Sequence, residues 1–225
     1  MTKAYHFLKQ DMRAGSGKEK PWTVGEERTV PKPSRIGLCT YGYHSSPSWR
    51  DGLKYAPGPV ACIVEVSDPI ASDGTKQVSA TRKLLGAKDV SKEVCLFACD
   101  CAERALKRER KAGREPDERS WKAIIVVRRY AIGEATLVEL NATYAANAAT
   151  YAAAAAATYA ANAAAYAAAA AATYAANAAN AATYAANAAA YAAYAAAADE
   201  ATEIKWQRKR LARYLDALFA DKGAK

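Results

Sequence analysis

The stretch "SKEVCLFACDCAERALKRERKAG", residues 91–113, decides the fold class, because the spacing of apolar residues changes where it begins. Before it, "VACIVEV" (60–66) is a β-branched run that is typical of a strand. Within it, apolar residues recur with a period of about 3.6, which predicts a helix ending near Gly113. The sequence therefore predicts an α+β protein, with a small mixed domain followed by a mainly helical region.

The mixed domain, called the head below, is expected to occupy residues 1–90. Ala4–Leu8 has the residues of a short strand. Ser46 precedes a proline and predicts the N-cap of a short helix. Asp73-Gly74 predicts a turn.

Residues 91–135 predict a neck of two helices, the second of which is capped by Asp117. Thr136 and Glu139 form a capping-box pattern that marks the start of a third helix. No glycine or proline follows until Gly223, so residues 136–225 predict one very long helix. As a single rod ending near Ala220, it would be about 125 Å long. The alternative is a break near Asn177–Asn180 that gives an antiparallel hairpin or bundle.

Residues 141–198 contain only Ala, Tyr, Asn and Thr. On a helix the tyrosines fall within an arc of roughly 160°, which leaves a strip of alanine alone. We expect this uncharged segment to be paired, as a coiled coil within or between chains, because an isolated one would aggregate. A spacer made by repeat expansion is the alternative. The interaction residues expected on this tyrosine stripe are Tyr144, Tyr151, Tyr159, Tyr166, Tyr174, Tyr184 and Tyr191.

The last part of the chain carries a second apolar stripe, formed by Ile204, Leu211, Leu215 and Leu218. Such a stripe must be covered, and in a rod it lies too far from the head for the head to cover it. It therefore predicts a homo-oligomer, or a protein partner, bound through the long helix.

The five cysteines are an odd number, and the first residues lack the apolar run of a signal peptide. Together these features predict a reduced, cytoplasmic setting. Cys95 and Cys99 lie one turn apart, but Cys101 lies on another side of the helix, so the group predicts buried structural cysteines and no metal site.

The formal net charge of +9 lies mostly in residues 1–135. This excess is compatible with a nucleic-acid partner, but no recognition motif accompanies it. The alanine-rich tract lacks Leu, Ile, Val and Phe and contains Asn throughout, so we expect no membrane insertion.

Two Tyr-His pairs are the candidate catalytic residues: Tyr5-His6 on the first strand and Tyr43-His44 before the short helix. With Glu65 on a later strand, they resemble the His, Tyr, Glu layout of ADP-ribosyltransferases. The resemblance implies NAD as cofactor, with His6 on the nicotinamide ribose, Tyr43 stacked on nicotinamide, Glu65 orienting the ribose or acceptor, and His44 nearby. The alternative is two histidines satisfied by hydrogen bonds in a small core, with no cofactor.

Three further stretches, "LFACDCAERAL", "DERSWKAIIVVRRYAIGEAT" and "EIKWQRKRLARYLDAL", resemble helices of a family of bacterial immunity proteins. The chain also resembles phage and bacterial proteins that join a small "GYH" domain to alanine-rich helices, and together these resemblances cover nearly the whole chain. The segment "TYAANAAAYAAAAAATYAAN" is similar to the helices of type I antifreeze proteins, which implies ice binding, but its threonines lack their 11-residue repeat.

The leading functional prediction is a non-enzymatic interaction or scaffold protein, related to phages or immunity, that associates through its Ala/Tyr-rich helix. An NAD-using transferase in the head is the first alternative. An ice-binding helix is the second.

Overall fold

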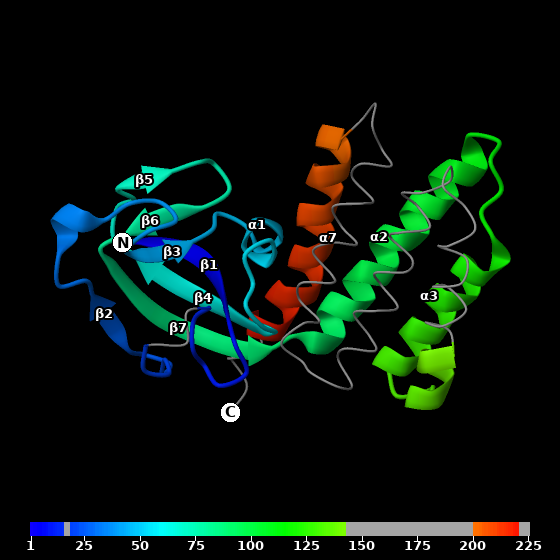
Figure 1. Ribbon diagram of the computed structural model, residues 1–225, viewed down its shortest axis with the longest axis horizontal. Helices are drawn as coiled ribbons and strands as arrows, with labels where there is room; N and C mark the ends of the chain where they lie inside the picture. Colours follow the sequence, from blue (N-terminus) through cyan, green and yellow to red (C-terminus); the bar gives the residue numbers. More distant parts are fainter. Residues whose placement is uncertain (16–18, 143–199, 221–225) are drawn as a thin grey trace. The chain divides into compact units, whose positions relative to one another are not determined.

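The computed structural model describes residues 1–15, 19–142 and 200–220 (Figure 1). Antiparallel sheets and helices are both present, so the α+β prediction is confirmed. The chain forms two compact units. Unit 1 consists of Met1–Val90 and Ala212–Lys225, and unit 2 consists of Ser91–Leu211.

The larger sheet of unit 1 is antiparallel and has the strand order β1-β4-β7-β2. Its strands are β1 (Thr2–Leu8), β4 (Val60–Val66), β7 (Thr81–Asp89) and β2 (Glu27–Thr29). In the register, His6 pairs with Cys62, and Arg82 pairs with Val66. Because alternate residues of a strand share a face, His6 and Arg82 lie on the same face of this sheet.

A smaller sheet has the order β3-β6-β5, with β3 at Tyr43–Ser45, β6 at Gln77–Ser79 and β5 at Ala71–Ser72. The predicted turn joins β5 to β6, and the Asp73 carboxylate accepts the amide protons of the two residues after Gly74. A 3-10 helix, η1 (Pro33–Arg35), precedes β3.

The two faces of the larger sheet are covered differently. One face carries an apolar cluster of Ala4, Leu8, Trp22, Val60, Cys62, Val64, Val66 and Leu84. On the other face, the Trp49 ring lies 4.4 Å from the Tyr5 ring and 6.0 Å from the Phe7 ring, measured between centroids. Trp49 begins the short helix α1 (Trp49–Leu53).

The cap of α1 differs from the prediction. Ser48, not Ser46, is the N-cap, and its hydroxyl accepts the amide proton of Asp51 at 3.2 Å. The reason is that Ser46 is held in an extended bridge, in which its backbone N–H and C=O both bond to Tyr5. The helix can therefore begin only after this bridge.

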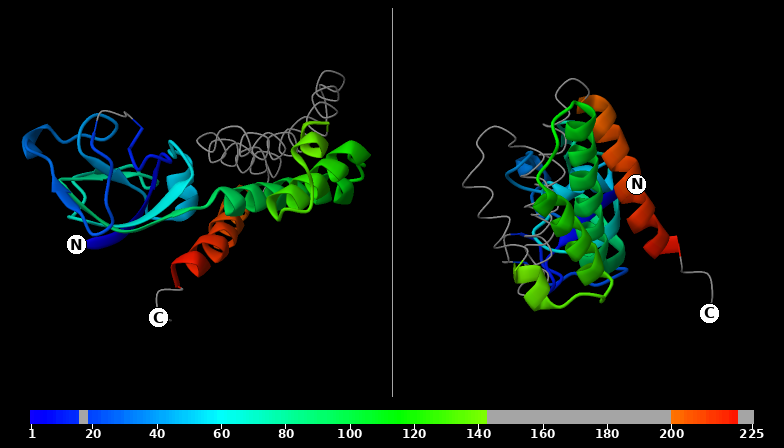
Figure 2. Two further views of the ribbon diagram at one scale, coloured as in Figure 1. Left: turned by 90° about the horizontal axis from the view of Figure 1, so that it is seen from below. Right: turned by 90° about the vertical axis from the view of Figure 1, so that its right-hand side faces the viewer.

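Unit 2 contains α2 (Ser91–Lys111) and α3 (Glu118–Ala131), which pack side by side (Figure 2). Asp117 caps α3 as predicted, accepting the amide proton of Arg119 at 2.8 Å. The capping box is also confirmed, because Thr136 and Glu139 each accept the other's amide proton. The next helical residues reach the edge of the described region.

The three clustered cysteines of α2, Cys95, Cys99 and Cys101, are buried as predicted. Burial raises the pKa of the Cys95 thiol to about 12 and raises that of Cys99 even further. Both side chains are therefore neutral thiols at physiological pH.

The predicted single rod from Thr136 to Ala220 is wrong. Arg128, just before its expected start, and Arg210, near its expected end, both contact the Asp100 carboxylate, at 2.7 Å and 2.5 Å. A straight helix from 136 to 210 would hold its ends about 110 Å apart. The tyrosine stripe and the hairpin alternative fall on residues 143–199, which lie outside the described residues.

The C-terminal apolar stripe lies on α7 (Glu200–Ala220). Leu211 and Leu215 are fully buried within a single chain, so they cannot form the exposed surface that the oligomer prediction required. Glu203 and Gln207 are fully buried too, whereas Ile204 and Leu218 are only partly covered. The buried face thus follows the spacing 203, 207, 211, 215, which the apolar residues alone do not reveal.

The C-terminal half of α7 packs within unit 1. The Phe219 ring stacks on the Trp49 ring at 5.5 Å, and the Trp49 indole N–H donates to Asp216 at 2.8 Å. None of the described helices combines the length and the apolar character that crossing a membrane requires.

Candidate functional site

The second Tyr-His pair is placed by a glycine and a bridge. Gly42 has a φ of 122°, and a Cβ there would lie 2.5 Å from the Val78 side chain, so only glycine fits at this position. Two residues after His44, Ser46 forms the backbone bridge to Tyr5. The segment that carries Tyr43 and His44 is therefore held beside the strand that carries His6.

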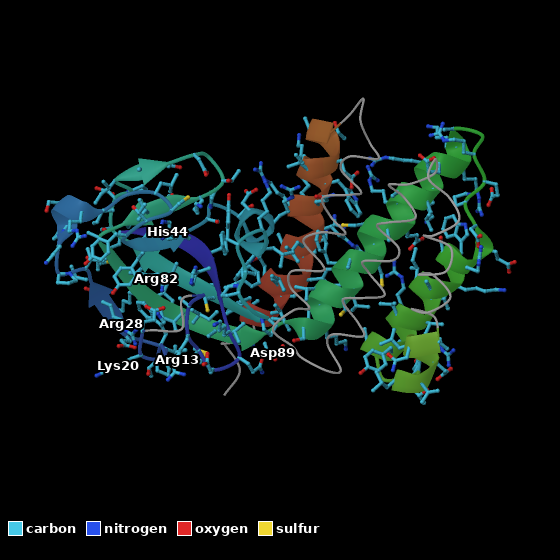
Figure 3. The ribbon with its side chains drawn as sticks, viewed as in Figure 1. Arg13, Lys20, Arg28, His44, Arg82 and Asp89 are labelled. Atoms are coloured by element: carbon cyan, nitrogen blue, oxygen red, sulfur yellow. The ribbon has the colours of Figure 1, made fainter. Side chains whose placement is uncertain are left out.

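A cavity of about 520 Å³ in unit 1 is lined by His6, Tyr43 and His44 together. Three of the four candidate catalytic residues thus meet in one place. Arg82 lines the same cavity and donates from its guanidinium to the backbone oxygen of His44 at 3.2 Å (Figure 3). The volume falls in the range of small-molecule sites.

His6 is the more enclosed of the two histidines. Its Nε2 atom is buried and has no hydrogen-bond partner in the described residues. Burial lowers the pKa of His6 well below its ordinary value, and the nearby Arg82 and His44 lower it further. The imidazole is therefore neutral at pH 7, with one nitrogen free to bond to a ligand.

His44 is less enclosed and is held by its own loop. Its Nε2 atom accepts the amide proton of Cys39 at 2.9 Å. Burial lowers the pKa of His44, and Lys76 and Arg82 lower it further. Like His6, it is a neutral imidazole in an environment of positive charge.

Arg82 is the main charge of the cavity wall. Its side chain is buried, and its guanidinium lies 4.3 Å from the Trp22 ring centroid and 5.0 Å from that of Tyr43. In the described part of the chain it makes no ion pair within 4.0 Å. Burial lowers the pKa of Arg82 to about 10, so it remains charged at pH 7. Its cost of burial is offset by the aromatic rings and only weakly by carboxylates.

Glu65, the fourth candidate, does not join the site. It pairs with Lys3 on β1 and with Lys83 on β7, whereas His6 is three residues from Lys3 along the same strand. An odd separation puts two residues on opposite faces of a sheet. The carboxylate therefore belongs to the other face, and the His, Tyr, Glu layout is incomplete.

The carboxylate that does line the cavity is Glu19. It accepts the amide proton of Ala14 at 3.1 Å and the indole proton of Trp22 at 3.3 Å, and Arg28 lies 4.0 Å away. These bonds make Glu19 an anchor for its loop. Sequence reasoning missed Glu19 because it lies in a turn-rich stretch without a motif.

The sequence analysis also missed Arg82, although the neighbouring residues could have indicated that it is buried. It is an arginine within a predicted extended segment, before the apolar residues of "TRKLLGAKD". A charged residue on the buried side of a strand requires a partner or a function. Only the alternation of buried and exposed residues along β7 shows that Arg82 lies on its buried side.

A second hollow, of about 340 Å³, lies in unit 2 along α2 and α7 and is lined mostly by basic residues. These charges are largely used within the unit. Arg104 and Arg108 bond to the buried Glu203, at 2.7 Å and 2.5 Å, and Arg210 bonds to Asp100. The side chains that line this hollow therefore form ion pairs that connect α2 with α7.

The cavity of unit 1 combines a buried cation, two neutral imidazoles and an aromatic ring. Such a wall can bind an oxyanion through the guanidinium and a flat ring through tyrosine. When the chain is compared with known proteins, no family model, curated protein or solved structure matches it.

Proposed function

We propose that unit 1 binds a nucleotide of the NAD class in the cavity that His6, Tyr43 and His44 line. The observation that carries the proposal is the buried Arg82, which faces this cavity with no ion pair in the described residues. A pyrophosphate would supply the missing negative charge, since arginine binds phosphate oxygens through paired N–H groups.

The imidazoles support the same class of ligand. The unpartnered Nε2 of His6 can bond to a ribose hydroxyl or a phosphate oxygen. Burial is the main cause of the lowered pKa of His6, and an anion beside it would counter the smaller contribution of Arg82.

The proposal is limited to binding, because Glu65 lies on the opposite face of the sheet from His6. A transfer step would need another carboxylate to stabilise positive charge on the ribose. The interaction role expected of the tyrosine stripe stays a prediction, as do the resemblances to phage, immunity and antifreeze proteins.

Isothermal titration calorimetry on the full chain tests the proposal with ADP-ribose, NAD and adenosine. We expect ADP-ribose and NAD to bind and adenosine to bind at least roughly tenfold more weakly, since it lacks the phosphates. Equal affinities for adenosine and ADP-ribose, or no binding of any of them at millimolar concentration, would overturn the proposal.

A pair of matched variants locates the site. Arg82→Gln should weaken ADP-ribose binding roughly 10- to 100-fold, because it removes a charge-assisted hydrogen bond. Lys83→Gln removes the same charge from the next residue of β7, on the other face, and should leave the affinity unchanged. Equal losses in the two variants would show that only the overall charge matters. Circular dichroism of both variants confirms that they are folded.

A further inference from the structure

Cys39 differs from the other cysteines of the chain. It is the exposed one, whereas the other four are buried. Its φ of 66° lies in the left-handed region, which a residue other than glycine adopts at a cost. It lines the same cavity as His44, which accepts its amide proton. An exposed thiol on a strained backbone is thus held at the cavity.

Lys76 is in direct contact with this thiol. Its ammonium donates to the Cys39 sulfur at 2.8 Å and lies 4.3 Å from the centroid of the Tyr55 ring. This hydrogen bond to Cys39 is the main reason why the pKa of Lys76 is raised. Lys76 comes from the turn that leads into β6, far from Cys39 in sequence, so the contact joins two loops at the cavity.

We propose that Cys39 and Lys76 form a reversible, oxidation-driven covalent crosslink at the cavity of unit 1. The nitrogen and sulfur are already in contact, so the bond needs only local movement of the exposed Cys39 and the partly exposed Lys76 side chains. Both residues lie outside the apolar core, so the crosslink would form without disturbing the core packing. The four buried cysteines are shielded from the same oxidant.

The chemistry requires a peroxide as oxidant. Hydrogen peroxide converts the Cys39 thiol to a sulfenic acid and is itself reduced to water. The Lys76 amine, after releasing a proton to solvent, attacks the sulfenic sulfur. An S–N bond forms, the S–O bond breaks, and the hydroxyl leaves as water with a proton from the nitrogen. The sulfenamide product has two hydrogen atoms fewer than the starting thiol and amine.

Reduction reverses the crosslink. Two equivalents of a small thiol break the S–N bond and are oxidised together to a disulfide. Cys39 and Lys76 are recovered as thiol and amine. Whether the cavity carries the crosslink would then depend on the relative concentrations of peroxide and thiol around the protein.

Intact-protein mass spectrometry after peroxide treatment of the full chain tests the crosslink. The wild type should lose two hydrogen atoms, fail to react with dimedone, and yield one peptide that joins residues 39 and 76. Lys76→Arg keeps the charge but lacks the amine, so it should gain one oxygen atom and react with dimedone. Cys39→Ser should give neither the crosslinked peptide nor a dimedone adduct at residue 39. Lys83→Arg, the control, should behave as wild type.

Two results would overturn the proposal. One is a wild-type protein that gains oxygen and reacts with dimedone as Lys76→Arg does. The other is a Lys76→Arg variant that also loses two hydrogen atoms, which would mean a disulfide with another cysteine. All of these variants change exposed or partly exposed side chains, so folding is not at risk.

The crosslink would also obstruct the entry of a ligand into the cavity, and this expectation rests on the proposed nucleotide function. We expect the crosslinked protein to bind ADP-ribose more weakly and dithiothreitol to restore the affinity. The mass measurement needs no nucleotide, and the titration of reduced protein needs no crosslink. Failure of the crosslink and failure of the nucleotide site are therefore told apart.

Discussion

Trp49 is the side chain whose replacement tests the packing of unit 1 most directly. It is 2% exposed, and it lies against Tyr5 and Phe7 of the sheet and against Phe219 of α7. Its indole N–H donates to the exposed Asp216 carboxylate. Trp49 thus contacts the C-terminal part of α7 both through its buried ring and through one hydrogen bond.

The two contributions can be separated by size. Trp49→Ala removes about 200 Å² of buried area and should lower the free energy of unfolding by about 3–5 kcal/mol. Trp49→Phe keeps most of the apolar contact but loses the hydrogen bond, so the loss should be about 1–2 kcal/mol. A double-mutant cycle of Trp49→Phe with Asp216→Ala should give a coupling of about 1 kcal/mol.

Urea unfolding followed by far-UV circular dichroism measures the wild type, the three single variants and the double variant. A loss of less than about 1 kcal/mol in Trp49→Ala would refute the packing of Trp49 against the sheet and α7, because removing a fully buried tryptophan costs more than that. A coupling energy near zero would refute the hydrogen bond alone and leave the ring packing in place.

Three further predictions concern other buried groups. The pKa of His6 is lowered by folding, so below pH 6.5 the unfolded chain binds a proton that the folded chain excludes. Stability should fall as the pH is lowered from 6.5 to 5, and His6→Asn should flatten this slope of unfolding free energy by up to about 1.4 kcal/mol per pH unit. Glu203→Gln should cost about 2–3 kcal/mol in urea unfolding, because two partly exposed arginines lose their shared anion. Leu215→Asp should unfold the chain, seen by circular dichroism, rather than yield folded monomers in sedimentation, because the residue is buried within one chain.

The parts of the fold that the sequence predicted correctly have local causes. The strand at 60–66 is a β-branched run, and Asp117 and Thr136 cap helices through atoms a few residues away. The cap at Ser48 and the path of the helices depend on distant partners. Ser46 is drawn into a bridge by Tyr5, forty residues earlier, and no local rule contains this contact.

The long-rod prediction failed for a related reason. The absence of glycine and proline permits a continuous helix, but it does not require one. What brings the start and the end of the region together is the Asp100 carboxylate, which Arg128 and Arg210 share. Each of these three residues is ordinary in sequence, and only their convergence excludes the rod.

The candidate site was predicted only in part. A motif identifies residues, but it does not show on which face of a sheet they lie. The pairing of tyrosine with histidine located His6, Tyr43 and His44, whose strands meet at the bridge between Tyr5 and Ser46. Glu65 was added by its position along the chain, but strand parity turns it to the other face.

Parity could have corrected this assignment in advance. On β4 the apolar residues Cys62, Val64 and Val66 share the face of the apolar cluster, and Glu65 falls between them. A carboxylate in that alternation belongs to the opposite face, with Lys3 and Lys83 as its cross-strand neighbours. The same rule applied to β7 places Arg82 with Leu84 on the cavity side. Counting residues by face therefore identifies Arg82 as a buried charge that lines the cavity, and this is the group on which the nucleotide proposal depends.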